Sequence, residues 1–437
     1  MKRRLIFGVT ALALAVYLAF GAALYFNQAR AMAQKDSADD YLHLFSDVLQ
    51  QVRAEYVDGS NLTYQTLTYS AIKGMVGSLD PHSEFLDPQD FQQLRDDTQG
   101  EFGGLGLVVS PKDGYVTVVA PMDNSPGFRA GIMTGDRIVK VDGADVERMP
   151  IDDVVKRLRG DPGTSVTVTV QRPSNGGEKT FTLTRAVIQI DMVKDINGRK
   201  EFPLGADGIG YIRISEFGDK TADELEAALR TLKGEGMKAL ILDLRLNPGG
   251  LLDEAVDVCG KFLPRGQLVV STEGRDPSQD SVRRADGRGD ELNGMPMVVL
   301  VDLGSASASE IVTGCLQDLH RAVILGEKTF GKGSVQSIFP FQDGSALKLT
   351  VAKCYTPSHR VIHEHGIQPD IVVPMTEEQE AALELRRAPG GLDTLDATNR
   401  ARIEQIQDVQ LDRAQDLLEG ILLYGRLMNQ PETMAAK

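Results

Sequence analysis

The sequence predicts an α/β core that carries a small β-rich module, with helical regions at both ends. Between residues 208 and 373, short apolar runs alternate with amphipathic stretches, the pattern of helices that cover a mostly parallel sheet. Between residues 100 and 185, apolar residues recur with period two and glycine turns bound the runs, which predicts strands. Residues 39–99 and 376–437 show charged, helical periodicity instead.

The composition is that of a folded protein that does not bind nucleic acid. The chain has 437 residues, of which 42% are hydrophobic and 25% are charged, so packed cores are expected. The formal net charge is −15. Beyond the N-terminus there is no long run of Lys or Arg to neutralise phosphates, which excludes nucleic acid as a partner.

The first 33 residues have the pattern of an export segment. Three basic residues at 2–4 precede an uncharged stretch from 5 to 26, and small residues at 31–33 follow. The stretch is longer than the apolar part of most cleaved signals and close to the ~20 residues that cross a bilayer. Cleavage and a retained membrane anchor therefore both stay open. In either case the rest of the chain is expected in the periplasm or at the outer face of the inner membrane.

These patterns divide the chain into five expected parts. In order, they are a signal peptide or membrane anchor (1–33), an N-terminal helical region (36–98), a β-rich module (99–186), an α/β core (187–375) and a C-terminal helical region (376–437). The helical regions could pair subunits of a homo-oligomer, although amphipathic helices also pack internally.

Cysteine and histidine usage gives no sign of a cofactor. Cys259, Cys315 and Cys354 are odd in number and lie in apolar contexts, which predicts buried residues rather than disulfides or nucleophiles. The run from His363 to His365 lacks the further ligands that a zinc site needs. We therefore expect neither a metal nor a cofactor.

The stretch GSASASE, residues 304–310, follows an apolar strand and begins a helix. Ser307 with Glu310 three positions later is a capping box pattern, so Ser307 is either a helix cap or a nucleophile. A helix N-terminus suits a nucleophile because its free N–H groups stabilise an oxyanion. No histidine stands in a recognisable triad arrangement, and the pattern G-x-S-x-G is absent.

A lysine offers another base. Lys332 lies between two glycines at the start of a strand, and Gln336 falls on the same face of the extended chain. A lysine that acts as a base needs a lowered pKa, which burial supplies; a solvated loop lysine is the alternative. The run NPGG, 247–250, ends another strand, and its backbone N–H groups suit an oxyanion hole.

Five motifs in order resemble those of the carboxyl-terminal processing peptidases, also called tail-specific proteases. They are LDPHS (79–83), DLRLNPGG (243–250), GSASASE (304–310), FGKGSVQ (330–336) and TPSHRVIHEHGIQPDIVV (356–373). The resemblance implies a serine endopeptidase with a Ser-Lys dyad on a crotonase-like or ClpP-like core, with an inserted PDZ domain. It also implies cleavage of exported proteins near their C-termini.

The resemblance assigns a role to each matching position. It makes Ser307 the nucleophile, Lys332 its general base, and Gln336 the residue that assists the lysine. The oxyanion hole is expected from backbone N–H groups of Gly249 or Gly250 and of Ala308.

Three positions depart from the family's pattern. Leu246 stands where glycine or a polar residue is frequent, His359 where glycine is frequent, and Cys354 where tyrosine is frequent. The change at Leu246 could alter the oxyanion loop without removing its backbone donors. The other two leave the substrate contacts around them open.

The segment 99–186 fits the PDZ assignment, because AGIMTGDRIVKVDG at 130–143 is typical of PDZ domains. The glycine-rich loop would capture a terminal carboxylate, and the next strand would pair with the peptide against a helix. The expected peptide contacts are Gly103, Gly104, Leu105, Gly106, Leu107, Val154 and Leu158. Proteins or peptides with free C-termini are thus the expected partners, and their docking could also gate the active site.

Two other functions were weighed against proteolysis. A PDZ scaffold with an inactive core would bind C-terminal tails in the cell envelope, but the presence of both Ser307 and Lys332 argues against it. An acyl-CoA enzyme of crotonase type would share the core fold. The export segment and the PDZ segment argue against that alternative.

Overall fold

We describe the protein from a computed structural model. The described residues are 37–59, 62–112, 114–122, 124–172, 177–205, 207–287, 292, 294–387 and 391–428. The expected export segment, 1–33, lies outside them. Within these ranges, no helix reaches both the length and the hydropathy that crossing a bilayer requires.

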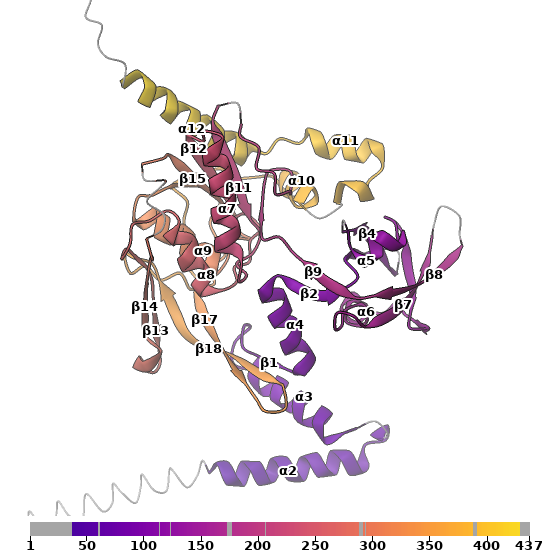
Figure 1. The fold of residues 1–437 in the computed structure, drawn as a ribbon. Helices are drawn as coiled ribbons and strands as arrows, with labels where there is room; N and C mark the ends of the chain where they lie inside the picture. Colours follow the sequence, from indigo (N-terminus) through magenta and orange to yellow (C-terminus); the bar gives the residue numbers. More distant parts are fainter. Residues whose placement is uncertain are drawn as a thin grey trace, which may run out of the picture. The chain divides into compact units, whose positions relative to one another are not determined.

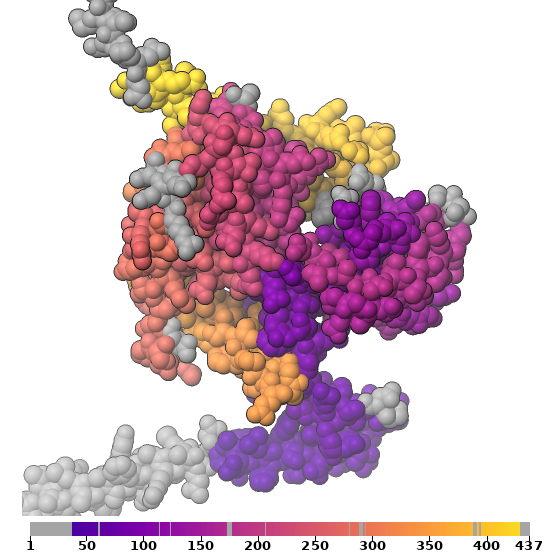
Figure 2. Space-filling model, viewed as in Figure 1, coloured from indigo at the N-terminus to yellow at the C-terminus, as the bar shows by residue number. Residues whose placement is uncertain are grey.

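The chain folds as two units, residues 1–85 and 86–437. The first unit contains the helices α2 (Ala38–Glu55) and α3 (Tyr64–Gly77), and the strand β1 (Glu84–Leu86) lies at its end. Helix α2 buries none of its residues, and most of its apolar side chains are exposed. Figure 2 draws the atoms of this helix in purple. The predicted N-terminal helices are therefore confirmed, although α2 contributes nothing to a core.

The second unit begins with helix α4 (Pro88–Gln99) and the β-rich module. The module's elements are β2 (Glu101–Gly104), β3 (Leu107–Lys112), β4 (Tyr115–Pro121), α5 (Pro126–Ala130), β5 (Arg137–Val141), β6 (Ala144–Asp145), α6 (Ile151–Leu158), β7 (Ser165–Gln171), β8 (Glu178–Thr184) and β9 (Ala186–Gln189). The antiparallel sheet has the order β3-β4-β5-β7-β8, so β3 is an edge strand. A separate ribbon pairs β2 with β9.

The α/β core follows in the chain and contains the strands β10 to β19. Its elements are β10 (Val193–Lys194), β11 (Ile209–Ile214), α7 (Thr221–Gly234), β12 (Ala239–Asp243), α8 (Leu252–Gly260), β13 (Leu268–Gly274), η2 (Pro277–Gln279), β14 (Ser281–Arg284), β15 (Met297–Val301), α9 (Ala308–Asp318), β16 (Val323–Gly326), β17 (Ser334–Pro340), β18 (Ala346–Tyr355) and β19 (Ile371–Val372).

The main sheet of the core is covered on both faces. Its order is β10-β11-β12-β15-β16-β19, and only the β10–β11 pair is antiparallel. Along β12, Leu240 and Leu242 pack with residues of α7, α8 and α9, whereas Ala239 and Ile241 pack with residues of α12 (Val409–Met428). Figure 1 labels these helices beside the strands of the sheet. Burial of both faces explains why the strands read as continuous apolar runs. The predicted α/β class is confirmed.

The C-terminal region is helical, as predicted, and joins the core through buried charges. Besides α12 it contains α10 (Glu377–Arg387), η4 (Gly391–Thr394) and α11 (Ala397–Gln405). The fully buried Arg245 donates to Asp243 at 2.7 Å and to Asp408 at 2.7 and 2.8 Å. Arg387 also bonds Asp243 and donates to the carbonyl oxygen of Arg245 at 3.0 Å. This charge network lies directly before the NPGG loop.

Candidate active site

One cavity of about 370 Å³ brings together the residues that the sequence singled out. The predicted residues that line it are Ser307, Lys332, Gln336, Gly249, Gly250 and Ala308. They come from the loop after β12, the start of α9 and the start of β17. Helix α4 adds Leu94 and Thr98 to the wall, which the sequence analysis did not foresee.

Three serines of the 304–310 stretch have different surroundings. Ser305 is fully buried and its hydroxyl donates to the carbonyl oxygen of Leu244 at 2.8 Å. Ser309 is also buried and donates to the carbonyl oxygen of Asn247 at 2.9 Å. Ser307 is half-buried and lines the cavity. Two of the serines therefore attach the start of α9 to the strand and loop beside it, and Ser307 faces the open space.

The backbone of Ser307 is strained. Its φ is 54° and its ψ is −112°, a conformation that non-glycine residues rarely adopt. Helix α9 begins at the next residue, so the predicted helix start is confirmed. Strain of this kind at a cavity wall is typical of residues held in place for chemistry.

Glu310 holds the two loops of the cavity together. Its fully buried carboxylate accepts hydrogen bonds from the N–H groups of Ser307 (2.9 Å), Gly331 (2.7 Å) and Lys332 (2.8 Å). It also accepts from the hydroxyl of Thr329 at 2.6 Å. Burial raises the pKa of Glu310, while these four bonds oppose the rise. The capping pattern indicated only the bond to Ser307; the other three partners lie about twenty residues later in the chain.

Two backbone N–H groups beside Ser307 have no protein acceptor within the described part of the chain: those of Gly250 and Ala308. The N–H of Gly249 instead donates to the side-chain oxygen of Asn247 at 2.9 Å. Gly249 has φ +106°, and a Cβ there would lie 2.6 Å from the Cβ of Ser307. Of the two expected glycines, Gly249 thus provides close approach and Gly250 an available donor.

Lys332 lies half-buried in the cavity, and its surroundings lower the pKa of its amine. Burial lowers the pKa of Lys332, and the charge of Lys348 lowers it further, whereas the carboxylate of Glu310 raises it. The solvated loop lysine considered above is therefore not what the structure places here. Gln336 lies nearby, and its amide nitrogen donates to Ser334 at 2.9 Å and to Thr350 at 3.2 Å.

An apolar wall faces these polar groups. It includes Leu252, Ile311, Val335 and Cys354. Burial raises the pKa of the Cys354 thiol to about 12, so the thiol is protonated at neutral pH. All three cysteines are buried and free, as the sequence predicted.

The two departures at glycine positions adopt left-handed backbones. Leu246 has φ +59°, and His359 has φ +63°. Leu246 is held there by a bond from its N–H to Asp302 at 2.9 Å. His359 stacks on Tyr355 with ring centroids 4.6 Å apart and bonds Glu273 at 2.9 Å. Left-handed φ angles explain why glycine suits both positions.

The residues of the β-rich module that were expected to contact a peptide lie in different elements of the structure. Gly103 and Gly104 belong to strand β2, so the loop that was expected to begin at Gly103 is shorter. The N–H groups of Leu105 and Gly106 have no protein acceptor among the described residues, and Leu107 opens the edge strand β3.

The two expected contacts on helix α6 lie in the module's core. Val154 is 0% exposed and Leu158 is 6% exposed, and both pack with the β-sheet residues. Their helical spacing correctly predicted an apolar face. In this conformation that face supports the module instead of lining an open groove.

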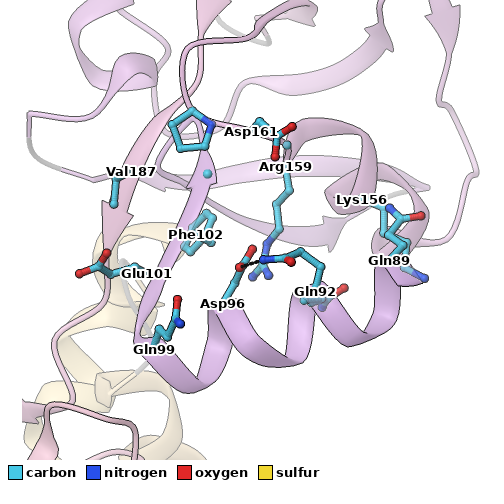
Figure 3. Close-up of a pocket in the computed structure, with 14 residues that line it drawn as sticks. Gln89, Gln92, Asp96, Gln99, Glu101, Phe102, Lys156, Arg159, Asp161 and Val187 are labelled. Carbon is cyan, nitrogen blue, oxygen red and sulfur yellow. Dashed lines mark hydrogen bonds between the residues drawn. The ribbon is translucent and has the colours of Figure 1, made fainter. Parts of the chain in front are cut away.

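A second cavity of about 300 Å³ lies between α4, β2 and the end of α6 (Figure 3). Arg159 stacks over the ring of Phe102 at 4.4 Å and pairs with Asp97 at 2.9 Å. Lys156 pairs with Asp90 of α4, also at 2.9 Å. Gly103 lines this cavity, but none of the expected catalytic residues does.

Comparison with known proteins gives consistent matches. The sequence profile of peptidase family S41 matches residues 208–373, and a PDZ domain profile matches residues 117–172. A protein of Bartonella bacilliformis named carboxy-terminal-processing protease is 39% identical over 404 residues, which cover 89% of this chain and 90% of that protein. A Synechocystis protein named carboxyl-terminal-processing protease is 38% identical and covers 70% of this chain and 71% of its own length. A solved structure titled photosystem II D1 C-terminal processing protease is 32% identical, covers 77% of this chain and 93% of that one, and has a TM-score of 0.43.

Proposed function

Because this chain belongs to peptidase family S41, whose carboxy-terminal-processing members are serine proteases, we propose that it cleaves exported proteins near their C-termini through a Ser307–Lys332 dyad. The observation that carries this proposal is a single cavity that contains Ser307, Lys332 and two unpaired backbone donors, the N–H groups of Gly250 and Ala308. The other two serines of the 304–310 stretch, Ser305 and Ser309, are buried and do not line the cavity.

The proposed reaction is acyl transfer. The neutral amine of Lys332 takes the hydroxyl proton of Ser307 as Oγ attacks the scissile carbonyl carbon. The resulting oxyanion accepts hydrogen bonds from Gly250 and Ala308, which are fixed before the reaction by the loop and the helix start. The Lys332 ammonium then gives its proton to the leaving amine as the C–N bond breaks. Water, deprotonated by Lys332, hydrolyses the ester on Ser307.

Gln336 has an assisting role in this proposal. Its amide nitrogen already donates to Ser334 and Thr350, which fixes the side chain on the cavity wall. The amide oxygen is then the group that can accept from the Lys332 amine and orient it. The amide nitrogen can only donate hydrogen bonds and the amide oxygen can only accept them, so the two atoms take different partners.

We propose that the PDZ domain captures the substrate's C-terminal tail. The edge strand β3 offers a free side for a peptide strand, and the unpaired N–H groups of Leu105 and Gly106 precede it. Gly106 has φ +63°, so successive N–H groups can converge on one carboxylate. An extracytoplasmic location, with the N-terminal segment either cleaved or retained in the membrane, completes the proposal.

The experiment compares Ser307→Ala, Lys332→Ala and Lys332→Arg with the parent enzyme on an unfolded protein. Lys328→Ala is the matched control, because Lys328 is an exposed lysine four residues before Lys332. We expect all three site variants to lose cleavage and the control to retain it. If any of the three site variants cleaves as the parent does, the proposed dyad is wrong.

A second arm tests tail capture and separates the enzyme from an inactive scaffold. Fluorescence titration of the Ser307→Ala protein with one peptide, free or amidated at its C-terminus, should give clearly tighter binding for the free acid. Equal affinity for both forms contradicts carboxylate capture. Tail binding by a parent protein that cleaves nothing supports the scaffold instead.

A further inference from the structure

A second lysine lines the active-site cavity without an assigned role. Lys348 lies on β18 opposite Ile338 of β17, and both line the cavity together with Lys332. Two residues farther along β18 and before any irregularity in the pairing, Thr350 lies on the same face as Lys348 and bonds Gln336, which also lines the cavity. Lys348 therefore belongs to the side of β18 that faces the dyad.

The ammonium of Lys348 forms no ion pair within the described ranges. An unpaired charge at the wall of a half-buried cavity acts on its neighbours over a longer range than a paired one, because no counter-charge cancels it. Burial and the Lys348 charge both lower the pKa of Lys332.

Other titratable groups around Lys332 come from several elements. Glu310 of α9 is the acid that bonds its N–H, and Glu216 lines the cavity from the loop after β11. Burial and the charge of Asp97 raise the pKa of Glu216. The loop with His363, Glu364 and His365 packs against the glycines on either side of Lys332. Among these groups, Lys348 is the cation that opposes the attraction of Glu310.

We propose that Lys348 is a positioning residue for the dyad, whose fixed positive charge on the cavity wall keeps the Lys332 amine unprotonated near neutral pH. This inference rests on the proposed Ser307–Lys332 mechanism. Protonated Lys332 cannot accept the hydroxyl proton, so a charge that disfavours protonation enlarges the active fraction of the enzyme. Lys348 contributes through its charge and takes no proton from the substrate.

The test measures kcat/KM against pH between 6 and 10 with a fluorogenic peptide that has uncharged side chains and a free C-terminus. The variants are Lys348→Met, Lys348→Arg and Lys353→Met. Lys353 is the matched control, because it lies on the same strand but is exposed and does not line the cavity.

In Lys348→Met we expect the midpoint of the acid limb to move up by about one pH unit, the size of a like-charge interaction at the edge of a cavity. Below the parent's midpoint, kcat/KM then falls about tenfold, and the loss shrinks as the pH rises. In Lys348→Arg, which keeps the charge, the acid limb of kcat/KM should have the same midpoint as in the parent. The acid limb of the control Lys353→Met should also match that of the parent.

Two results overturn the inference. One is an acid limb in Lys348→Met that superimposes on that of the parent. The other is a uniform loss at every pH, which is the outcome of a substrate contact or of a local packing defect. Ser307→Ala and Lys332→Ala are run beside these variants. If Ser307→Ala or Lys332→Ala stays active, the proposed dyad is wrong. If both are inactive and the acid limb of kcat/KM in Lys348→Met does not shift, only the proposed role of Lys348 is wrong.

Discussion

The buried charge network before the NPGG loop makes a quantitative prediction about stability. Arg245 is fully buried and its guanidinium donates to two carboxylates and to the side chain of Gln410. Arg245→Met keeps most of the aliphatic packing and removes the charge. Removing one partner of a buried ion pair typically costs about 3–5 kcal/mol, because the other charges stay buried.

The structure places the expected cost of Arg245→Met at the lower end of that range. Asp243 keeps three partners: the guanidinium of Arg387, the hydroxyl of Tyr211 at 2.7 Å and the backbone N–H of residue 245 at 2.9 Å. The side chain of Asp408 is 12% exposed, so water can hydrate it in part. We therefore expect the free energy of unfolding to fall by about 3 kcal/mol.

The assay is urea unfolding at neutral pH, followed by far-UV circular dichroism, in a Ser307→Ala background, which under the proposed mechanism does not cleave itself. Arg400→Met is the control, because Arg400 pairs with Glu404 while both side chains are about half exposed, 47% and 48%. Exposed pairs contribute at most about 1 kcal/mol. A cost for Arg245→Met no larger than that of the control refutes the role of the buried network.

The same pair of proteins tests the electrostatics through pH. Burial would raise the pKa of Asp243, but the charges of Arg245 and Arg387 hold it well below its ordinary value. A depressed pKa stabilises the fold above the unfolded value of about 3.9, and that contribution is lost as the pH falls below it. The stability gap between parent and Arg245→Met should thus narrow toward acid. A gap that stays constant from pH 7 to pH 3 contradicts this account.

Three further changes test other parts of the core. Glu310→Gln removes the charge that four donors share, so we expect kcat/KM to fall about 100-fold through misplacement of Ser307, with the fold retained by circular dichroism. Gly249→Ala places a Cβ 2.6 Å from that of Ser307, so cleavage should be lost while binding of a free C-terminal peptide persists in a fluorescence titration. Burial raises the pKa of Glu254 to about 7, so the parent loses stability as the pH rises toward and through that value. Glu254→Gln should then stabilise the protein by roughly 1 kcal/mol at pH 8.5, since the site is half exposed, and by much less at pH 5 in urea unfolding.

The sequence predicts the parts of this site that depend on local pattern. The strand, turn and helix around Ser307 follow from an apolar run, a glycine and a capping pattern within a dozen residues. The continuous apolar strands indicate a sheet that is buried on both faces, and the two packed faces of β12 agree with that. Local signals of this kind can be found from the sequence because the residues that satisfy them are close together in the chain.

Contacts between distant segments could not be predicted in the same way. The periodicity of α6 predicted an apolar face with Val154 and Leu158, but no pattern distinguishes a core face from a peptide groove. Helix α4 lines the cavity only because of how the elements pack. The same holds for the hydrogen bonds that Glu310 accepts from a loop about twenty residues later in the chain. Lys348 has no motif at all, and only the pairing of β17 with β18 brings it to the cavity.

The three serines of residues 304–310 indicate how a helix start and the proposed nucleophile can share one stretch. Ser305 and Ser307 lie in the turn before α9 and Ser309 in the first turn of that helix, and Ser307 has a positive φ of 54°. Ser305 and Ser309 then bond the carbonyl oxygens of Leu244 and Asn247, so they hold the stretch against the segment that carries Gly250. The cap is made by the carboxylate of Glu310, which bonds the N–H of Ser307 and leaves the hydroxyl side toward the cavity. The bond from the Ser307 N–H to Glu310 does not use the hydroxyl, so the capping pattern does not count against the proposed nucleophile.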